Sequence, residues 1–492
     1  EAARRLGVPT PHRPWCDPLP TEVSLADLPA GAMALVDEPD EQRQRADGWA
    51  PERGHLVVVG PAGSGRSNAL AAVALGLASV QSADELHIYV LDLGSGALDA
   101  LAALPHCGAV VRAGDDERCR RLLRWLGGER RRRLAAARSE HAPAIVVIVD
   151  GIGALSALGN EPGGYQLLDT FSALVADGAS IGIHLAVSAE RVAAVPAALA
   201  AAAGERWLLA GTNPDGDIPP CRRSPTGRAV DAAGREVQIA SAEPLAESVT
   251  RVAASSGPPA RRPYPIGALP ATVDLACLPS PAAHAGVTHL PIGIGDDDLA
   301  AVSLPLHAGD HGVVIGPARS GKSCVLALLA SQIRVAHPDA ILCGVAPRAS
   351  PLREHPALDR WAEALDADAL VEPAGRLLFV FVDDADRVEG LEPLLGLPDL
   401  HVLAAGTADA LRAAYGHWTQ RVRRSRLGVL LRPDLDLDGE LLGVSLPRRP
   451  PVAPLPGRGY LVHDGRFTMV QCARVATLGT SPNTAAGPHR RE

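Results

Sequence analysis

Residues 316–323 read G-P-A-R-S-G-K-S, which is the spacing of a phosphate-binding loop set between an apolar run and a helical segment. Lys322 can neutralise the β- and γ-phosphates of a nucleotide, and Ser323 can give its hydroxyl to Mg²⁺. Lys322 is the only lysine in a chain whose Lys+Arg total is 47, so a strongly arginine-biased sequence keeps an ammonium group here. Small residues let the backbone curl and turn its N–H groups toward a phosphate chain. We predict that the cradle residues are Gly316, Ser320 and Gly321.

A phosphate-binding loop needs an acidic partner on another strand to hold Mg²⁺. Residues 377–384 read L-L-F-V-F-V-D-D, an apolar strand that ends in two carboxylates. We predict that Asp383 and Ser323 bind the metal and that Asp384 and Lys322 are catalytic. Asp384 stands where active motors usually carry glutamate, and its side chain is shorter by one methylene, so ATP hydrolysis is expected to be slow or absent. The alternative is an acidic strand end that caps the following helix.

A weaker loop of the same type occupies residues 60–67, G-P-A-G-S-G-R-S. Arg66 replaces the lysine, and a planar guanidinium does not take the place of an ammonium group without rearrangement. The acidic strand of this half ends at Asp150, with glycine next rather than a second carboxylate. Two alternatives stay open: the site binds nucleotide, with Ser67 and Asp150 on Mg²⁺ but no hydrolysis, or it binds nothing and persists as architecture. The predicted cradle residues are Gly60, Gly63, Ser64 and Gly65.

The segments around both loops alternate between apolar strands and helices. In the first half we predict strands at 85–92, 144–149 and 183–187, and helices at 68–79, 112–138 and 167–176. Buried strands that alternate with helices favour a parallel sheet covered on both faces. The predicted fold class is therefore α/β, with two tandem P-loop NTPase (RecA-like) domains, each a mostly parallel sheet with helices on both faces.

An internal duplication sets the domain limits. Residues 19–28 return as 269–278, and each half closes on a Gly-Arg pair followed by a glutamine, at 227–228 with Gln238 and at 457–458 with Gln471. A period this long indicates two whole domains rather than a solenoid. We predict an N-terminal linker (1–18), a degenerate P-loop ATPase domain (19–245), a Ser-, Ala- and Pro-rich linker (246–268), a second P-loop ATPase domain (269–474) and a disordered tail (475–492).

Composition narrows the function classes. A chain of 492 residues with net charge −9 argues against a broadly basic nucleic-acid surface. The eight cysteines show no metal-ligand spacing and are expected to be reduced thiols in the cytoplasm. The arginines at 130–133, with Arg120, Arg121 and Arg124, are interpreted as a solvated helix rather than a nucleic-acid stripe. His184 and His401 are interpreted as core histidines, or as histidines that contact site residues, rather than as metal ligands. No apolar run reaches the length of a membrane span, and the first residue, Glu1, indicates a piece of a longer polypeptide.

The paired loops and their flanks resemble the FtsK/SpoIIIE-type ATPases, in particular the tandem C-terminal ATPase domains of the EccC component of type VII secretion systems. The loops alone are generic, and their combination with the flanks is more specific. The segments that carry the resemblance are 35–39, 103–106, 291–295, 441–443 and 456–458, together with Gln471.

The resemblance implies an ATP- and Mg²⁺-binding module of a protein-export translocase. It further implies assembly as a hexamer with other ATPase domains of the same longer chain, docking of small helical secreted substrates, and a cytoplasmic position with the full-length protein anchored at the inner face of the cell membrane. Two rivals stay open. One is a DNA translocase of the FtsK class, and the other is a regulatory scaffold that binds nucleotide without hydrolysing it.

Overall fold

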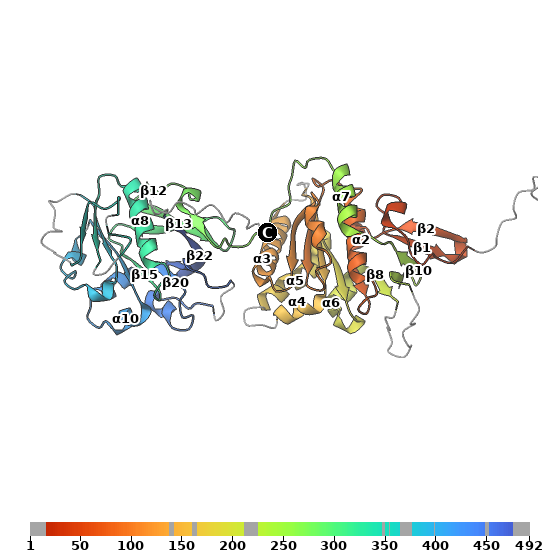
Figure 1. Cartoon of the computed structure of the whole chain (residues 1–492). Helices are drawn as coiled ribbons and strands as arrows, with labels where there is room; N and C mark the ends of the chain where they lie inside the picture. The colour runs from red at the N-terminus through yellow and green to blue at the C-terminus, as the bar shows by residue number, and fades with distance from the viewer. Residues whose placement is uncertain are drawn as a thin grey trace, which may run out of the picture. The chain divides into compact units, whose positions relative to one another are not determined.

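The computed structural model describes residues 16–136, 142–159, 165–210, 225–346, 350–353, 355–364, 376–397, 399–447 and 452–475. The chain forms two compact units, Glu1–Gly267 and Ala268–Glu492. Figure 1 shows each unit as a sheet with helices against it. Among the described residues, no helix is long and apolar enough to cross a membrane.

The first unit is built on a sheet with the strand order β2-β1-β10-β9-β8-β3-β7-β6-β4-β5. Six neighbouring strands are parallel: β8 (Ala203–Leu209), β3 (His55–Val59), β7 (Ile183–Ala189), β6 (Ala144–Asp150), β4 (Leu86–Asp92) and β5 (Cys107–Arg112). The others extend the sheet as an antiparallel arm: β9 (Arg228–Val230), β10 (Glu236–Ile239), β1 (Ala34–Glu38) and β2 (Arg43–Asp47). The central parallel strands β3, β4, β6 and β7 are almost entirely buried because helices cover both faces of the sheet.

Each face of this sheet has its own hydrophobic core. On one face, α2 (Arg66–Ala78) and α7 (Leu245–Ser255) pack together (Figure 1). Residues 69–78 of α2 are all buried, as expected for a helix that is apolar all round. Four helices pack on the other face: α3 (Asp116–Ala135), α4 (Ile152–Gly159), α5 (Tyr165–Asp177) and α6 (Ala197–Ala202).

The second unit repeats this plan around the order β12-β13-β22-β21-β20-β15-β19-β18-β16-β17. Its parallel strands are β20 (Gly428–Leu431), β15 (Gly312–Ile315), β19 (Leu400–Gly406), β18 (Leu378–Val382), β16 (Ile341–Val345) and β17 (Arg360–Ala362). Its arm is formed by β21 (Arg458–His463), β22 (Arg466–Arg474), β13 (Val287–Gly295), β12 (Ala282–His284) and β14 (Ala301–His307), and β11 (Val273–Asp274) pairs with β22. One face packs on α8 (Lys322–Ala336), and the other on the short helices α10 (Ala408–Ala413) and α11 (Thr419–Val422).

The predicted fold class is confirmed, with differences at particular segments. The predicted helix 112–138 begins too early, because Arg112 ends β5, an edge strand whose short apolar run gave little signal. The first part of the segment predicted as a linker forms α7, whose apolar side packs on α2. The antiparallel arms were not predicted at all. Residues 1–15 and 476–492 of the predicted terminal segments lie outside the described residues.

The interpretation of the arginine-rich helix α3 as a solvated face is wrong for its best-buried members. Arg121 is 3 % exposed and donates to the carbonyl of Gly267. Arg133 donates to the carbonyls of Ile181 and Pro143, at 2.9 and 2.7 Å. These guanidinium groups donate charge-assisted hydrogen bonds to backbone carbonyls rather than to solvent alone.

Both units carry a histidine pair at the amino ends of their central parallel strands. His184 and His401 are buried, as expected for core residues. The N–H of Leu185 donates to Nδ1 of His55 at 3.2 Å, which requires a neutral ring. Burial lowers the pKa of His184 and of His311 to about 4. Among the described residues, no cluster of His, Cys, Asp or Glu could hold a metal ion, and the cysteines are free thiols.

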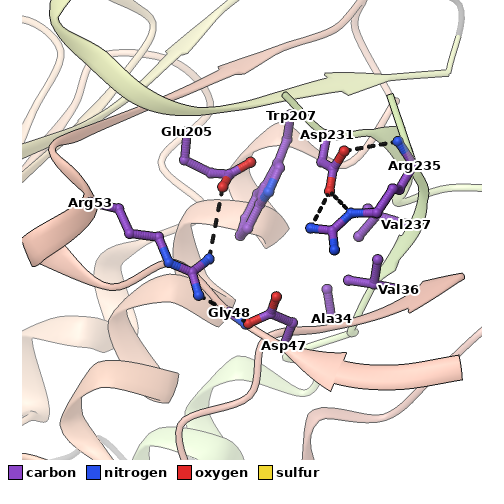
Figure 2. A pocket seen from close by; sticks show the side chains of 10 residues that line it. All are labelled: Ala34, Val36, Asp47, Gly48, Arg53, Glu205, Trp207, Asp231, Arg235 and Val237. Atoms are coloured by element: carbon purple, nitrogen blue, oxygen red, sulfur yellow. Dashed lines mark hydrogen bonds and ion pairs between the residues drawn. The ribbon is translucent and has the colours of Figure 1, made fainter. Parts of the chain in front are cut away.

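A small cavity at the base of the first arm contains a charge network (Figure 2). Its volume is about 10 Å³, room for one water molecule at most. Arg53 lies between Asp47 and Glu205, at 3.5 and 3.9 Å, and Trp207 lines the same cavity. Oε1 of Glu205 is buried without a hydrogen-bond partner in the described part of the chain. Burial and the negative charge of Asp231 raise the pKa of Glu205 above its ordinary value.

We expect Glu205→Gln to stabilise the first unit at neutral pH by about 1 kcal/mol, because the neutral amide removes the cost of burying a carboxylate charge. A raised pKa means that the folded state favours the protonated carboxyl, so this group's stabilising contribution is present below about pH 4.5 and is lost as the pH rises through the folded pKa. The gain should therefore vanish below about pH 4.5. Urea unfolding followed by tryptophan fluorescence measures it, with exposed Glu52→Gln as the matched control. An equal gain at pH 4 and pH 7 would contradict the assignment.

Candidate nucleotide-binding site

The loop at residues 316–323 lies at the carboxyl edge of the second sheet. It joins β15 to α8, and β15 pairs in parallel with both β19 and β20. In open parallel sheets, ligands bind outside the carboxyl ends of the strands, and the amino end of a helix favours anions. The fold therefore brings the predicted cradle residues to the position where a polyphosphate can be bound.

Glycine is required at two points of this loop. A Cβ on Gly316 would lie 2.6 Å from the carbonyl oxygen of Leu431 and 2.7 Å from Oγ of Ser320. Gly321 precedes α8 with φ +106°, a conformation that side chains with a Cβ rarely adopt. Ser320 itself is fully buried, and its hydroxyl has no hydrogen-bond partner among the described residues. Close packing and a left-handed backbone therefore require glycine at these two positions of the loop.

Lys322 begins α8 and folds its side chain back over the loop. Its Nζ donates to the carbonyl of Pro317 at 2.9 Å. Burial lowers the pKa of Lys322, and the negative charges of Asp383, Asp384 and Asp386 oppose this effect. An ammonium group that has lost part of its hydration gains most from an anion placed against it. The electrostatics of Lys322 therefore suit a phosphate ligand.

Asp383 follows β18, which is separated from β15 by β19. Its carboxylate is 6 % exposed and accepts a hydrogen bond from the hydroxyl of Ser350 at 2.7 Å. The N–H of Asp384 donates to the other carboxylate oxygen at 3.2 Å, and Asp384 has the left-handed φ of +49°. The geometry holds Asp383 toward the carboxyl edge, within electrostatic range of Lys322. Ser323 lies in the first turn of α8, at the same edge of the sheet as Asp383.

The first unit places its corresponding residues differently. Ser67 donates to Oδ2 of Asp150 at 2.6 Å, so the two predicted metal ligands lie in direct contact. Ser188 donates to the other carboxylate oxygen, and the N–H of Gly151 donates to Ser188 Oγ at 2.9 Å. Asp150 is 3 % exposed. Its charge is thus already satisfied by two hydroxyl groups.

Arg66 lies across the first loop. One guanidinium nitrogen donates to the carbonyl of Gly60, and the other is 3.8 Å from Oε1 of Glu190. Glu190 brings negative charge to the same cation that a phosphate would need. The cradle residues Gly60, Gly63, Ser64 and Gly65 nevertheless keep the loop shape, with φ of +78° at Gly63 and +101° at Gly65. This site therefore has the backbone of a phosphate loop, but the guanidinium group of Arg66 is already in contact with Gly60 and Glu190.

Sequence reasoning missed the polar groups that hold the acidic residues. Ser188 and Ser350 are separated from Asp150 and Asp383 by more than 30 positions, and no motif points to them. Ser188 lies near the end of β7, the strand next to β6, so strand order would have identified it. Glu190 follows the same strand, and its role depends on the direction of the Arg66 side chain.

Comparisons with known proteins show which chains this sequence is similar to. Residues 31–249 match the model of the FtsK/SpoIIIE family. The chain is 28% identical over 67% of its length to the ESX-4 secretion system protein EccC4 of Mycobacterium tuberculosis, and 28% identical over 92% of its length to an ESX secretion system protein EccC of Thermomonospora curvata. It spans only 29% and 41% of the lengths of these two relatives.

Two solved structures share the fold over at least 90% of this chain. One is Thermomonospora curvata EccC (ATPases 2 and 3) in complex with a signal sequence peptide, with a TM-score of 0.64, 24% identity, and coverage of 90% of this chain and 92% of that chain. The other is EssC (ATPases 2 and 3) from Geobacillus thermodenitrificans, with a TM-score of 0.73, 19% identity, and coverage of 94% and 100%. At these identities the likeness shows the fold alone.

Proposed function

We propose that this chain is the ATP-binding module of a type VII secretion translocase. The premise is that residues 31–249 match the FtsK/SpoIIIE family and that the chain resembles the tandem ATPase domains of EccC proteins. The module couples nucleotide to protein export. One observation carries the proposal: the chain's only lysine lies in a glycine-constrained loop at the carboxyl edge of the second sheet, within electrostatic range of Asp383.

Each residue of the second site then has a defined role. The backbone of Gly316, Ser320 and Gly321 surrounds the phosphates, and Lys322 neutralises them. Ser323 and Asp383 hold Mg²⁺, which supplies charge neutralisation between the phosphates when bound. Asp384 is the residue that orients the attacking water, and its short reach makes hydrolysis slow or absent.

The first site is the weaker of the two in this proposal. Arg66 shares its charge with Glu190, and Ser67 and Asp150 are bonded to each other. These contacts support a site that binds nucleotide weakly or only shapes the domain. The chain acts as part of a longer polypeptide at the inner face of the membrane, assembled with further ATPase domains into a hexamer, and small helical secreted proteins are its substrates.

A pair of titrations tests the export function. The purified chain is mixed with a peptide copying the C-terminal tail of a small helical secreted protein from the same genome, and separately with duplex DNA. We expect saturable binding of the peptide and no DNA stimulation of ATP turnover. DNA-stimulated turnover without peptide binding would replace export by DNA translocation.

A further inference from the structure

A buried arginine near the end of the second unit joins three distant parts of the chain. Arg458 is 4 % exposed. Its Nε donates to Oε1 of Gln471 at 3.1 Å, and its Nη2 donates to the carbonyls of Leu269 and Pro270 at 3.1 and 2.8 Å. Nη1 donates to the carbonyl of Ala453 at 3.2 Å. These contacts satisfy the guanidinium group with acceptors that a lysine cannot reach together.

The residue before this arginine braces the phosphate loop. The N–H of Gly457 donates to the carbonyl oxygen of Ser320 at 2.9 Å. Gly457 has φ +76°, and a Cβ on Gly321 would lie only 3.4 Å from its nitrogen. Gln471 holds the turn from the other side, because its Nε2 donates to the carbonyl of Pro456 at 3.0 Å. The turn at 456–458 is thus fixed against the loop.

The first unit repeats the contacts to the glutamine, to the two carbonyls where the chain enters the unit, and to the loop. Arg228 donates to Oε1 of Gln238 at 3.0 Å and to the carbonyls of Leu19 and Pro20 at 3.1 and 2.9 Å. Gln238 donates to the carbonyl of Thr226 at 2.9 Å, and the N–H of Gly227 donates to the carbonyl of Ser64 at 3.0 Å. These contacts are therefore present beside a loop that has Arg66 in place of the lysine. The contacts therefore serve the shape of the loop and not the placement of the ammonium group.

We infer that Arg458 and Gln471 are positioning residues of the second nucleotide site, forming with Gly457 a clamp that ties the phosphate loop to Leu269 and Pro270, where the chain enters the unit. The inference rests on the proposed function. Across a trans peptide, the C=O of one residue and the N–H of the next point in opposite directions. Holding the Ser320 carbonyl toward Gly457 therefore turns the Gly321 N–H away from Gly457 and presets it for phosphate. The clamp also couples the entering segment to the geometry of the loop.

Arg458→Lys tests the clamp with two measurements on the full chain. The first is hydrogen exchange without nucleotide, comparing the Gly457 amide with the amides of β19, which report on overall stability. The second is the Kd for Mg·ATP by calorimetry. Because hydrogen bonds from a charged donor are lost, we expect about tenfold faster exchange at Gly457, unchanged β19, and a Kd raised by about tenfold or more.

Arg228→Lys is the matched control, because it removes the same contacts from the first unit and should leave Kd at the Lys322 site unchanged. Gly457→Ala provides a second variant, since its Cβ would lie 3.0 Å from Nε2 of Gln471 at a left-handed φ. Adding Gln471→Glu to Arg458→Lys should recover part of the affinity, because the new carboxylate can form an ion pair with the lysine.

The outcomes separate the two proposals. Wild-type chain that binds no Mg·ATP sinks the proposed function, and the exchange rates then decide the clamp alone. If Arg458→Lys leaves the exchange rate of the Gly457 amide unchanged, or accelerates the Gly457 and β19 amides equally, the clamp is overturned. This holds whether or not the chain binds nucleotide. If the wild type binds Mg·ATP and Arg458→Lys binds it with the same Kd, the positioning role of Arg458 is overturned.

Discussion

Lys322→Ala is expected to weaken Mg·ATP binding by about two orders of magnitude, the largest effect of any single substitution in this chain. The reason is that the variant removes the ammonium group facing the phosphates, and a hydrogen bond to a charged group contributes about 1.5–3 kcal/mol. Burial already lowers the pKa of Lys322, so its removal should cost the unliganded fold little. Calorimetric titration and a thermal melt of the same sample measure both effects.

Arg66→Ala is the matched control for this experiment. Arg66 occupies the same position of its loop, but its guanidinium lies against the carbonyl of Gly60 and near Glu190. We expect its removal to change the affinity by less than about threefold, within the usual range for a substitution away from the bound ligand. A loss of affinity in Arg66→Ala with none in Lys322→Ala would move the nucleotide to the first unit and reverse the order of the two sites.

Asp383→Asn is expected to remove most of the Mg²⁺-dependent gain in ATP affinity, about tenfold or more. Asparagine keeps the size and one oxygen but loses the negative charge that Mg²⁺ prefers in its shell. Measuring Kd with Mg²⁺ and with EDTA isolates this component. Asp386→Asn is the control, because Asp386 also acts on Lys322 at a distance but lies in the following 3-10 helix η8 (Ala385–Arg387).

Asp383→Asn should also lower the pH above which Mg·ATP binding is lost. The charge of Asp383 raises the pKa of Lys322 against the lowering by burial. Its removal lets that pKa fall further, so the ammonium form is lost at lower pH than in the wild type. Affinity in Asp383→Asn should therefore decline earlier as the pH is raised. A Mg²⁺ dependence and an alkaline limit that both match the wild type would exclude Asp383 from the metal site.

Local physics made several features predictable from the residues. The alternation of apolar strands with helices identified β4, β6 and β7 within a residue or two of their ends. The spacing of glycines, lysine and serine located both loops, because a curled backbone before a helix needs those residue types in that order. The duplication was readable because short motifs recur at nearly constant offset.

Pairings between distant segments were not predictable in the same way. Arg458 meets Leu269 across 189 positions, and Ser67 meets Asp150 across 83. Sequence spacing carries no information about such contacts until strand order is known. The antiparallel arms belong here too, since β1 pairs with β10 and β13 pairs with β22, segments that are far apart in the sequence.

The sequence by itself determined that two phosphate-type loops exist, that only the second has an ammonium group, and that an acidic strand end accompanies each. Only the tertiary structure decided that Arg66 lies against its own loop, that Ser188 and Ser350 hold the carboxylates, and that a Gly-Arg turn braces each loop. The physical reason is the sequence separation over which each kind of interaction acts. Backbone conformation and apolar periodicity act over a few residues, whereas the partner of a buried charge is whatever the folded sheet brings within hydrogen-bond distance.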